Sequence, residues 1–219
     1  MKIECITYIN LDYRKDKLSN IVNQLSQSKI INFKTSGIIC EKYTSYPTIS
    51  EIKNNTQRYK GTIGCFLAHL QAINSLIEYL EKNNSVNSYF MIMEDDLQID
   101  SKFWDFLEKI EPKPEFDFIF FGSGRNLDPS KCLDFEDKLW PVYDDYPVFC
   151  GAFCYAISCQ KIKIVKDIIN NVKIYQDFDR FIFTNKLLNN VCYQTNLLKV
   201  NNSFSSDRDP TCSWKIKNV

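Results

Sequence analysis

Residues Tyr89–Asp100 read YFMIMEDDLQID, a run of bulky apolar residues that stops at three consecutive acids. Near-continuous apolar runs of this length are typical of strands buried on both faces of a parallel sheet. Ligands of such sheets lie beyond the carboxyl ends of the strands. The stretch therefore predicts a buried strand of an α/β protein, and it places Glu94, Asp95 and Asp96 where a ligand would bind.

Three neighbouring carboxylates repel one another, and no basic residue lies near them in the sequence. Because side chains alternate along a strand, Glu94 and Asp96 are expected on one side and Asp95 on the other if the strand continues. Convergent carboxylates suit Mg²⁺ or Mn²⁺. The alternative is an acid-rich helix start, although the expected cap, Asp100 or Ser101, lies beyond the acids. The acids alone fit a phosphatase or nuclease site equally well.

Strand and helix patterns alternate on both sides of this stretch. Apolar alternation or apolar runs predict strands at 2–9, near 33–40, and at 88–93, 116–122, 148–158 and 191–195. Helical spacing predicts helices at 16–27, 62–82, 102–110, 159–170 and 174–189, with long loops at 41–61 and 126–147. This order predicts a mostly parallel central sheet with helices on both faces. Since no repeat or linker interrupts it, we expect a single domain over residues 1–219.

Charge and hydropathy exclude several classes of protein. The 219 residues include 27 basic and 27 acidic residues, so there is no basic excess for a nucleic-acid partner. No stretch is long enough to cross a bilayer, and the start lacks the pattern of a signal peptide. The expected location is the cytoplasm, or a secretory lumen if the sequence is a fragment.

The nine cysteines are odd in number, and most lie within apolar runs. We expect them to be reduced, buried, small apolar side chains. Cys150 and Cys154 are close enough for a zinc pair, but there is no second close pair, so they are interpreted as strand residues.

Four stretches in order resemble glycosyltransferase family 25. They are YINLDYRKDKL (8–18), GTIGCFLAHLQAI (61–73), FMIMEDDLQID (90–100) and GAFCYAISCQKI (151–162), and QDFDRFI (176–182) and SFSSD (203–207) match more loosely. That family includes bacterial lipooligosaccharide galactosyltransferases and the galactosyl- or glucosyltransferases of collagen hydroxylysine. The resemblance implies a GT-A-like (Rossmann-like) fold, a UDP-sugar donor, and Mn²⁺ or Mg²⁺ at the acidic triplet, which looks like a variant of the DxD motif.

The resemblance also implies contacts with the donor. Asn10, Asp12 and Arg14 would form the donor-nucleotide loop, where the forked guanidinium of Arg14 suits a diphosphate. The alternative is that Asp12 or Asp16 caps a helix and Arg14 is solvated.

Residues of the second matching stretch are further donor-site candidates. Gly61 and Gly64 are expected to flank the start of the long helix, and they would either admit a ligand close to the backbone or shape the turn. His69 is the only histidine. It would contact donor or acceptor, or be structural. Family members have a Ser-His pair where this chain has Ala68-His69.

The remaining implied roles fall on acids. Glu94 and Asp96, with Asp207 as a further contact, would bind the metal ion, and Asp95 would assist at the donor. Asp177 or Asp179 would be the general base, with Asp177 preferred. Only one of them is expected to face the site, since residues two apart cannot share a helix face. The alternative for the pair is an exposed helix start.

Two loops offer further candidates. Gly122, Ser123 and Gly124 form either a turn or a sugar-contacting loop. Asp144 and Asp145 lie beside tyrosines that suit carbohydrate, and the alternative is that both acids are solvated.

The expected function is metal-dependent transfer of a hexose, galactose or glucose, from a UDP-sugar to a hydroxyl group. The acceptor would be a glycan or the hydroxylysine of a collagen-like protein. Two alternatives remain open: a metal-dependent phosphoesterase, and an inactive transferase-like module that binds glycans or nucleotides.

Overall fold

The computed structural model of this protein describes residues 1–39, 56–84, 87–112, 116–121, 139–141, 151–171, 178–193, 195, 197–201 and 203–204. Several candidates from the sequence lie outside the described residues: Gly122, Ser123, Gly124, Asp144, Asp145, Asp177 and Asp207.

A seven-stranded sheet forms the centre of the molecule, in the order β2-β1-β3-β7-β5-β8-β6. The strands are β1 (Ile3–Asn10), β2 (Ile31–Ser36), β3 (Tyr89–Glu94), β5 (Phe118–Phe121), β6 (Leu139–Pro141), β7 (Cys154–Ser158) and β8 (Asn190–Tyr193). Pairing is parallel except where β7 meets β3 and β5 and where β6 meets β8. Five of the seven strands of this sheet, β1, β2, β3, β5 and β8, therefore run in one direction, and β6 and β7 run in the opposite direction.

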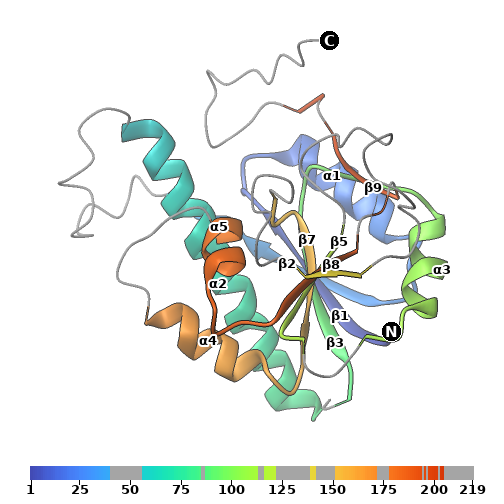
Figure 1. Ribbon diagram of the computed structural model, residues 1–219. Coiled ribbons are helices and arrows are strands. Elements are labelled where there is room, and N and C mark those ends of the chain that lie inside the picture. The colour runs from blue at the N-terminus through green and yellow to red at the C-terminus, as the bar shows by residue number, and fades with distance from the viewer. Residues whose placement is uncertain are drawn as a thin grey trace, which may run out of the picture.

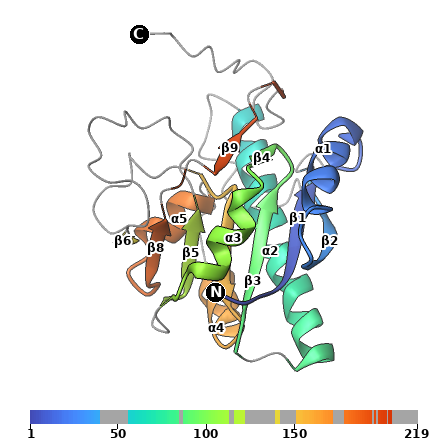
Figure 2. The same ribbon diagram turned by 90° about the vertical axis from the view of Figure 1, so that its right-hand side faces the viewer.

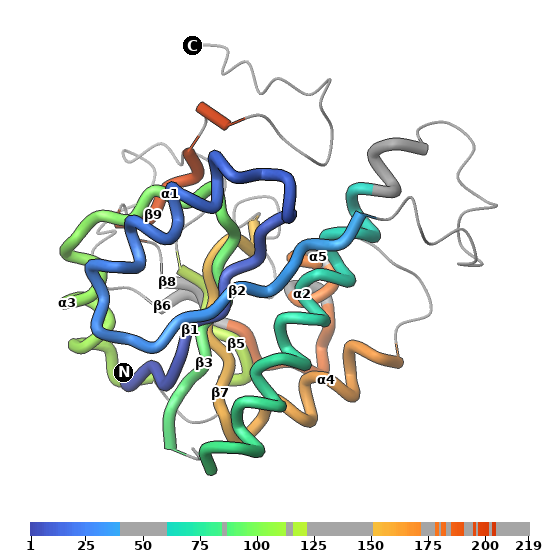
Figure 3. The backbone as a smooth tube through the Cα atoms, turned by 180° about the vertical axis from the view of Figure 1, so that it is seen from behind, coloured from blue at the N-terminus to red at the C-terminus, as the bar shows by residue number. Residues whose placement is uncertain are grey.

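Helices cover both faces of this sheet. They are α1 (Lys15–Leu25), α2 (Thr56–Asn83), α3 (Lys102–Lys109), α4 (Ile162–Asn170) and α5 (Phe178–Thr184). Figure 1 shows α2, α4 and α5 on one side of the sheet and α1 and α3 on the other, and the view from behind in Figure 3 shows the same division. This confirms the predicted α/β architecture, with a mostly parallel central sheet and helices on both faces.

A small two-stranded sheet lies above α3 in Figure 2, where β4 (Leu97–Ile99) pairs antiparallel with β9 (Leu198–Val200). Neither strand was predicted, nor was β6, because three residues are too few to show a period of two. The β4 strand follows directly after the acids, so the chain turns sharply at Asp95 and Asp96.

The alternation of side chains along β3 separates two apolar cores. Phe90 and Ile92 pack with α2, α4 and α5, whereas Met91 and Met93 pack with α1 and α3. All four are fully buried. By the same alternation Glu94, the last residue of the strand, lies on the α2 side.

The long helix begins earlier than the sequence indicates. Helix α2 starts at Thr56, so residues 56–61 are helical rather than part of the predicted loop. Their side chains are polar and show no apolar period, which is why the pattern missed them. Gly61 and Gly64 consequently lie within the helix, and the expectation that they flank its start is wrong.

Candidate active site at the carboxyl end of β3

The three acids do not stay together. Strand β3 ends at Glu94, and Asp95 and Asp96 form a turn, so the expected alternation of Glu94 and Asp96 with Asp95 does not continue. Glu94 Oε1 faces His69 Nε2 at 3.2 Å. Asp95 and Asp96 instead both face Lys17 of α1.

Lys17 supplies the positive charge that the sequence near the acids lacks. Its Nζ lies 3.4 Å from Asp96 Oδ2 and 3.7 Å from Asp95 Oδ1. The lysine side chain is only 5% exposed. Sequence reasoning missed this residue, but a signal was present: Lys17 stands one turn before Ile21 and two before Leu25, on the buried stripe of the helix.

Asn10, at the end of β1, joins this cluster. Ile9 pairs with Glu94 in the parallel register, which brings the next residue of each chain together beyond the sheet edge. The amide of Asn10 donates to Asp95 Oδ2 at 2.7 Å and to the Arg14 carbonyl at 3.1 Å. Asn10 therefore lies against Asp95, and its predicted contact with a donor nucleotide stays a prediction.

Two oxygen atoms in this cluster are buried and lack a hydrogen-bond partner among the described residues. They are Asn10 Oδ1 and Asp96 Oδ1. Buried oxygens without partners are costly in free energy, and at a strand end they indicate a place where a ligand would make the missing contacts.

The charges of the two aspartates are only partly compensated. Burial raises the pKa of Asp95 to about 6, against the opposing effects of Lys17 and the Asn10 amide, and Asp96 and Glu94 add to the rise. Burial, and then the negative charge of Glu94, also raise the pKa of Asp96, with Lys17 opposing. Together they offer more negative charge than the lysine neutralises, which favours a further cation.

Arg14 and Asp12 each bind neighbouring side chains that lie outside the turn at Asp95 and Asp96. The Arg14 guanidinium donates twice to Asp16, from Nε at 3.0 Å and from Nη2 at 2.9 Å, and these bonds lower the pKa of Asp16 to about 2. Arg14 is buried, so it is not the solvated residue of the alternative interpretation. Asp12 pairs with Lys34 and accepts a hydrogen bond from Ser36, both on β2. Their contacts with a donor stay predictions.

On the other side of β3, His69 is 1% exposed and held from two directions. Its Nδ1 lies 2.9 Å from the Tyr155 hydroxyl oxygen. Its ring stacks on that of Phe178, with the two ring centroids 4.4 Å apart. Burial would lower its pKa, but the hydrogen bonds and charges of Cys65 and Glu94 outweigh burial and raise the pKa of His69 to about 9. Cys65 and Tyr155 were also missed as site residues, although Cys65 stands one helical turn before His69.

Of the two expected base candidates, Asp179 lies in the first turn of α5. Its Oδ2 accepts a hydrogen bond of 2.8 Å from the backbone N–H of Gly151. Gly151 has a φ of 127°, which glycine adopts without strain. Asp179 therefore ties α5 to the chain entering β7, and its role as a general base stays a prediction. Asp177 lies outside the described residues.

No protein-family model matches the chain, and no curated protein matches it. Solved structures do. A glycosyltransferase involved in the glycosylation of the major capsid of PBCV-1 is 11% identical over 90% of this chain and 94% of that chain, with a TM-score of 0.47. The apo-form glycosyltransferase GlyE in Streptococcus pneumoniae TIGR4 is 10% identical, with a TM-score of 0.43, over 87% of this chain and 45% of that chain.

None of the helices that the structure describes is long and apolar enough to cross a membrane.

Proposed function

We propose that this protein is a metal-dependent glycosyltransferase that moves a hexose, galactose or glucose, from a UDP-sugar to a hydroxyl group of a glycan or a protein. One observation carries the proposal: the largely buried Asn10–Asp95–Asp96–Lys17 cluster lies at the carboxyl ends of β1 and β3, and two of its oxygen atoms have no hydrogen-bond partner among the described residues. In α/β sheets this edge is where nucleotides bind. The choice of hexose transfer as the reaction is supported by the resemblance of four stretches to glycosyltransferase family 25.

Asp96 is the residue best suited to hold a divalent ion. Its Oδ1 is buried without a partner among the described residues, and hard carboxylate oxygens match Mn²⁺ or Mg²⁺. Asp95 would assist, and Asp207, which lies outside the described residues, stays a predicted ligand. Glu94 faces His69 instead of Asp96, so it is not part of this proposed site. Such an ion supplies charge stabilisation for the departing diphosphate.

The chain's own residues would do the rest. Lys17 partly neutralises the charges of Asp95 and Asp96, and it would add a positive charge near the diphosphate. The carbonyl oxygen of the Asn10 side chain, which has no partner in the described part of the chain, suits a ribose hydroxyl or the N–H of a base. Asp177 would take the proton of the acceptor hydroxyl.

Thermal unfolding with UDP tests the proposal. UDP is expected to raise the melting temperature with Mn²⁺ and not with a chelator, and a ligand at about 100 times its dissociation constant adds roughly 2.7 kcal/mol. Equal shifts under both conditions would contradict the metal site. A screen of UDP-sugars for release of UDP, with and without Mn²⁺, then identifies the donor.

The same assays separate the alternatives. A phosphoesterase would hydrolyse a phosphate ester without any sugar acceptor. A binding module would show the UDP shift without turnover on any acceptor.

A further inference from the structure

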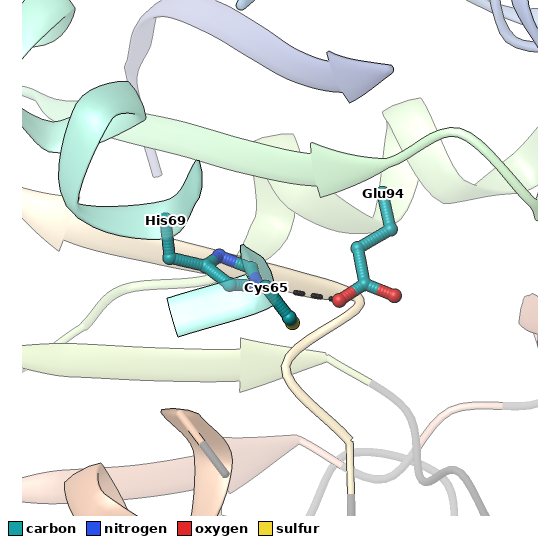
Figure 4. Close-up of side chains that lie close together, drawn as sticks. All are labelled: Cys65, His69 and Glu94. Atoms are coloured by element: carbon teal, nitrogen blue, oxygen red, sulfur yellow. Dashed lines mark hydrogen bonds and ion pairs between the residues drawn. The ribbon is translucent and has the colours of Figure 1, made fainter. Parts of the chain in front are cut away.

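A second group of potential metal ligands lies on the other side of β3. Cys65 and His69 are one turn apart on α2, and Glu94 ends β3. One ligand atom of each residue lies within 4.8 Å of the other two. Figure 4 shows the side chains of Cys65, His69 and Glu94 gathered in one place, with a dashed line for the contact between His69 and Glu94.

The distance between the His69 and Glu94 ligand atoms matches that expected around a zinc ion. With zinc bonds of about 2.0–2.3 Å, neighbouring ligand atoms of a tetrahedron lie about 3.3–3.7 Å apart. His69 Nε2 and Glu94 Oε1 are already at 3.2 Å. Residues four apart on a helix place both side chains on one face, which is the spacing that paired helical zinc ligands use.

The histidine ring is already oriented for this task. Tyr155 Oη lies 2.9 Å from Nδ1, so that an N–H on Nδ1 directs the Nε2 lone pair toward Cys65 and Glu94. Phe178 stacks on the ring with an interplanar angle of 12° and fixes its plane. An outer partner of this kind holds the tautomer and the ring in zinc sites.

We propose that Cys65, His69 and Glu94 bind a zinc ion, in a centre separate from the proposed Mn²⁺ or Mg²⁺ site at Asp96. One thiolate, one imidazole and one carboxylate form a borderline-soft ligand set, unlike the all-oxygen set at Asp95 and Asp96. Three protein ligands leave the fourth position to water, and Glu94, with 32% of its side chain exposed, opens the site to solvent.

Binding would release the thiol proton of Cys65 and any proton on His69 Nε2. The ion would link α2 to β3 directly beside the acid turn. The proposal goes beyond the glycosyltransferase function and does not require it.

Titration of the metal-free protein with Co²⁺ tests the site, since cobalt replaces zinc in such centres and shows thiolate-to-metal absorption in the near ultraviolet. We expect a single equivalent to give this band and Zn²⁺ to remove it. Cys65→Ser should abolish the band, whereas Cys159→Ser, at a buried thiol beside Ser88, should keep it. Absence of the band in the unaltered protein, or its persistence in Cys65→Ser, would overturn the proposal.

Two further variants test the zinc site independently of the folding of Cys65→Ser. Glu94→Gln keeps a hydrogen-bond acceptor for His69 but should weaken Zn²⁺ binding, and Tyr155→Phe should weaken it by about 10–100-fold, as loss of an outer partner does. Circular dichroism of each metal-free variant should match that of the unaltered protein. Unchanged zinc affinity in both variants would contradict the assignment. Retention of the Mn²⁺-dependent UDP shift in Cys65→Ser distinguishes this site from the proposed donor site.

Discussion

The ammonium group of Lys17 lies 3.4 Å from the carboxylate of Asp96, although 79 residues separate them in the chain. A cation thus already occupies one side of the acid turn. Lys17→Met should lower the free energy of unfolding of the metal-free protein by about 1–3 kcal/mol, because it leaves buried acids without their partner. Urea unfolding in a chelator measures this. Lys15→Met, an exposed neighbour on α1, should change it by less than about 0.5 kcal/mol, and an equal loss in both variants would contradict the pairing.

Asp96→Asn should separate binding from stability. The fold raises the pKa of Asp96, so it disfavours the charged carboxylate, and a neutral amide relieves that cost. We expect the metal-free melting temperature to stay the same or rise slightly, while the Mn²⁺-dependent UDP shift disappears. Asp105→Asn on the exposed face of α3 is the control. A large loss of metal-free stability would show that Asp96 is mainly a structural acceptor.

The pair Asp177 and Asp179 should divide into a chemical and a structural residue. Asp177→Asn is expected to reduce turnover by roughly 10²–10⁴-fold, the usual contribution of a general base, with little change in UDP binding. Asp179→Ala removes the acceptor of the Gly151 N–H and should cost about 1–3 kcal/mol of unfolding free energy. Normal turnover in Asp177→Asn would move the base to Asp144, Asp145 or Asp207.

In the metal-free protein, stability should depend on pH through His69. Burial opposes the charged imidazolium, but the hydrogen bonds and charges of Cys65 and Glu94 outweigh burial and raise the pKa of His69 from 6.5 to about 9 on folding. A raised pKa gives a stabilising contribution that is complete below about pH 6.5 and is lost as the pH rises through about 9. Unfolding free energies of the unaltered protein and of His69→Gln should therefore converge as the pH rises. A constant difference would mean that His69 does not titrate in this range.

Much of the fold follows from the sequence because the signals are local. The apolar run of β3 and the helical period of residues 62–82 predict elements that exist within a few residues of the expected bounds. The position of the acids at a carboxyl strand end also follows, since it needs only the direction of the chain and the class of sheet.

The separation of the acids could not be predicted in this way. It depends on the exact residue at which β3 ends. A strand that continued through Asp96 would place Asp96 beside Glu94, whereas a turn at Asp95 directs Asp96 toward α1. The partners that settle the question, Lys17 and His69, come from distant segments, and their approach to β3 depends on tertiary packing. The position of Lys17 on the apolar stripe of its helix does indicate a buried charge, so a search of the sequence for charged residues on apolar helix faces would have found it.

The place of β7 between β3 and β5 has a consequence for protein synthesis. A ribosome completes β1, β2 and β3 long before it reaches residues 154–158, the strand that pairs with β3 in the finished sheet. Until then one backbone edge of Tyr89–Glu94, among the most apolar stretches of the chain, has no strand beside it. Truncated chains that end before Cys154 should therefore aggregate, and the nascent chain should depend on chaperones for that interval.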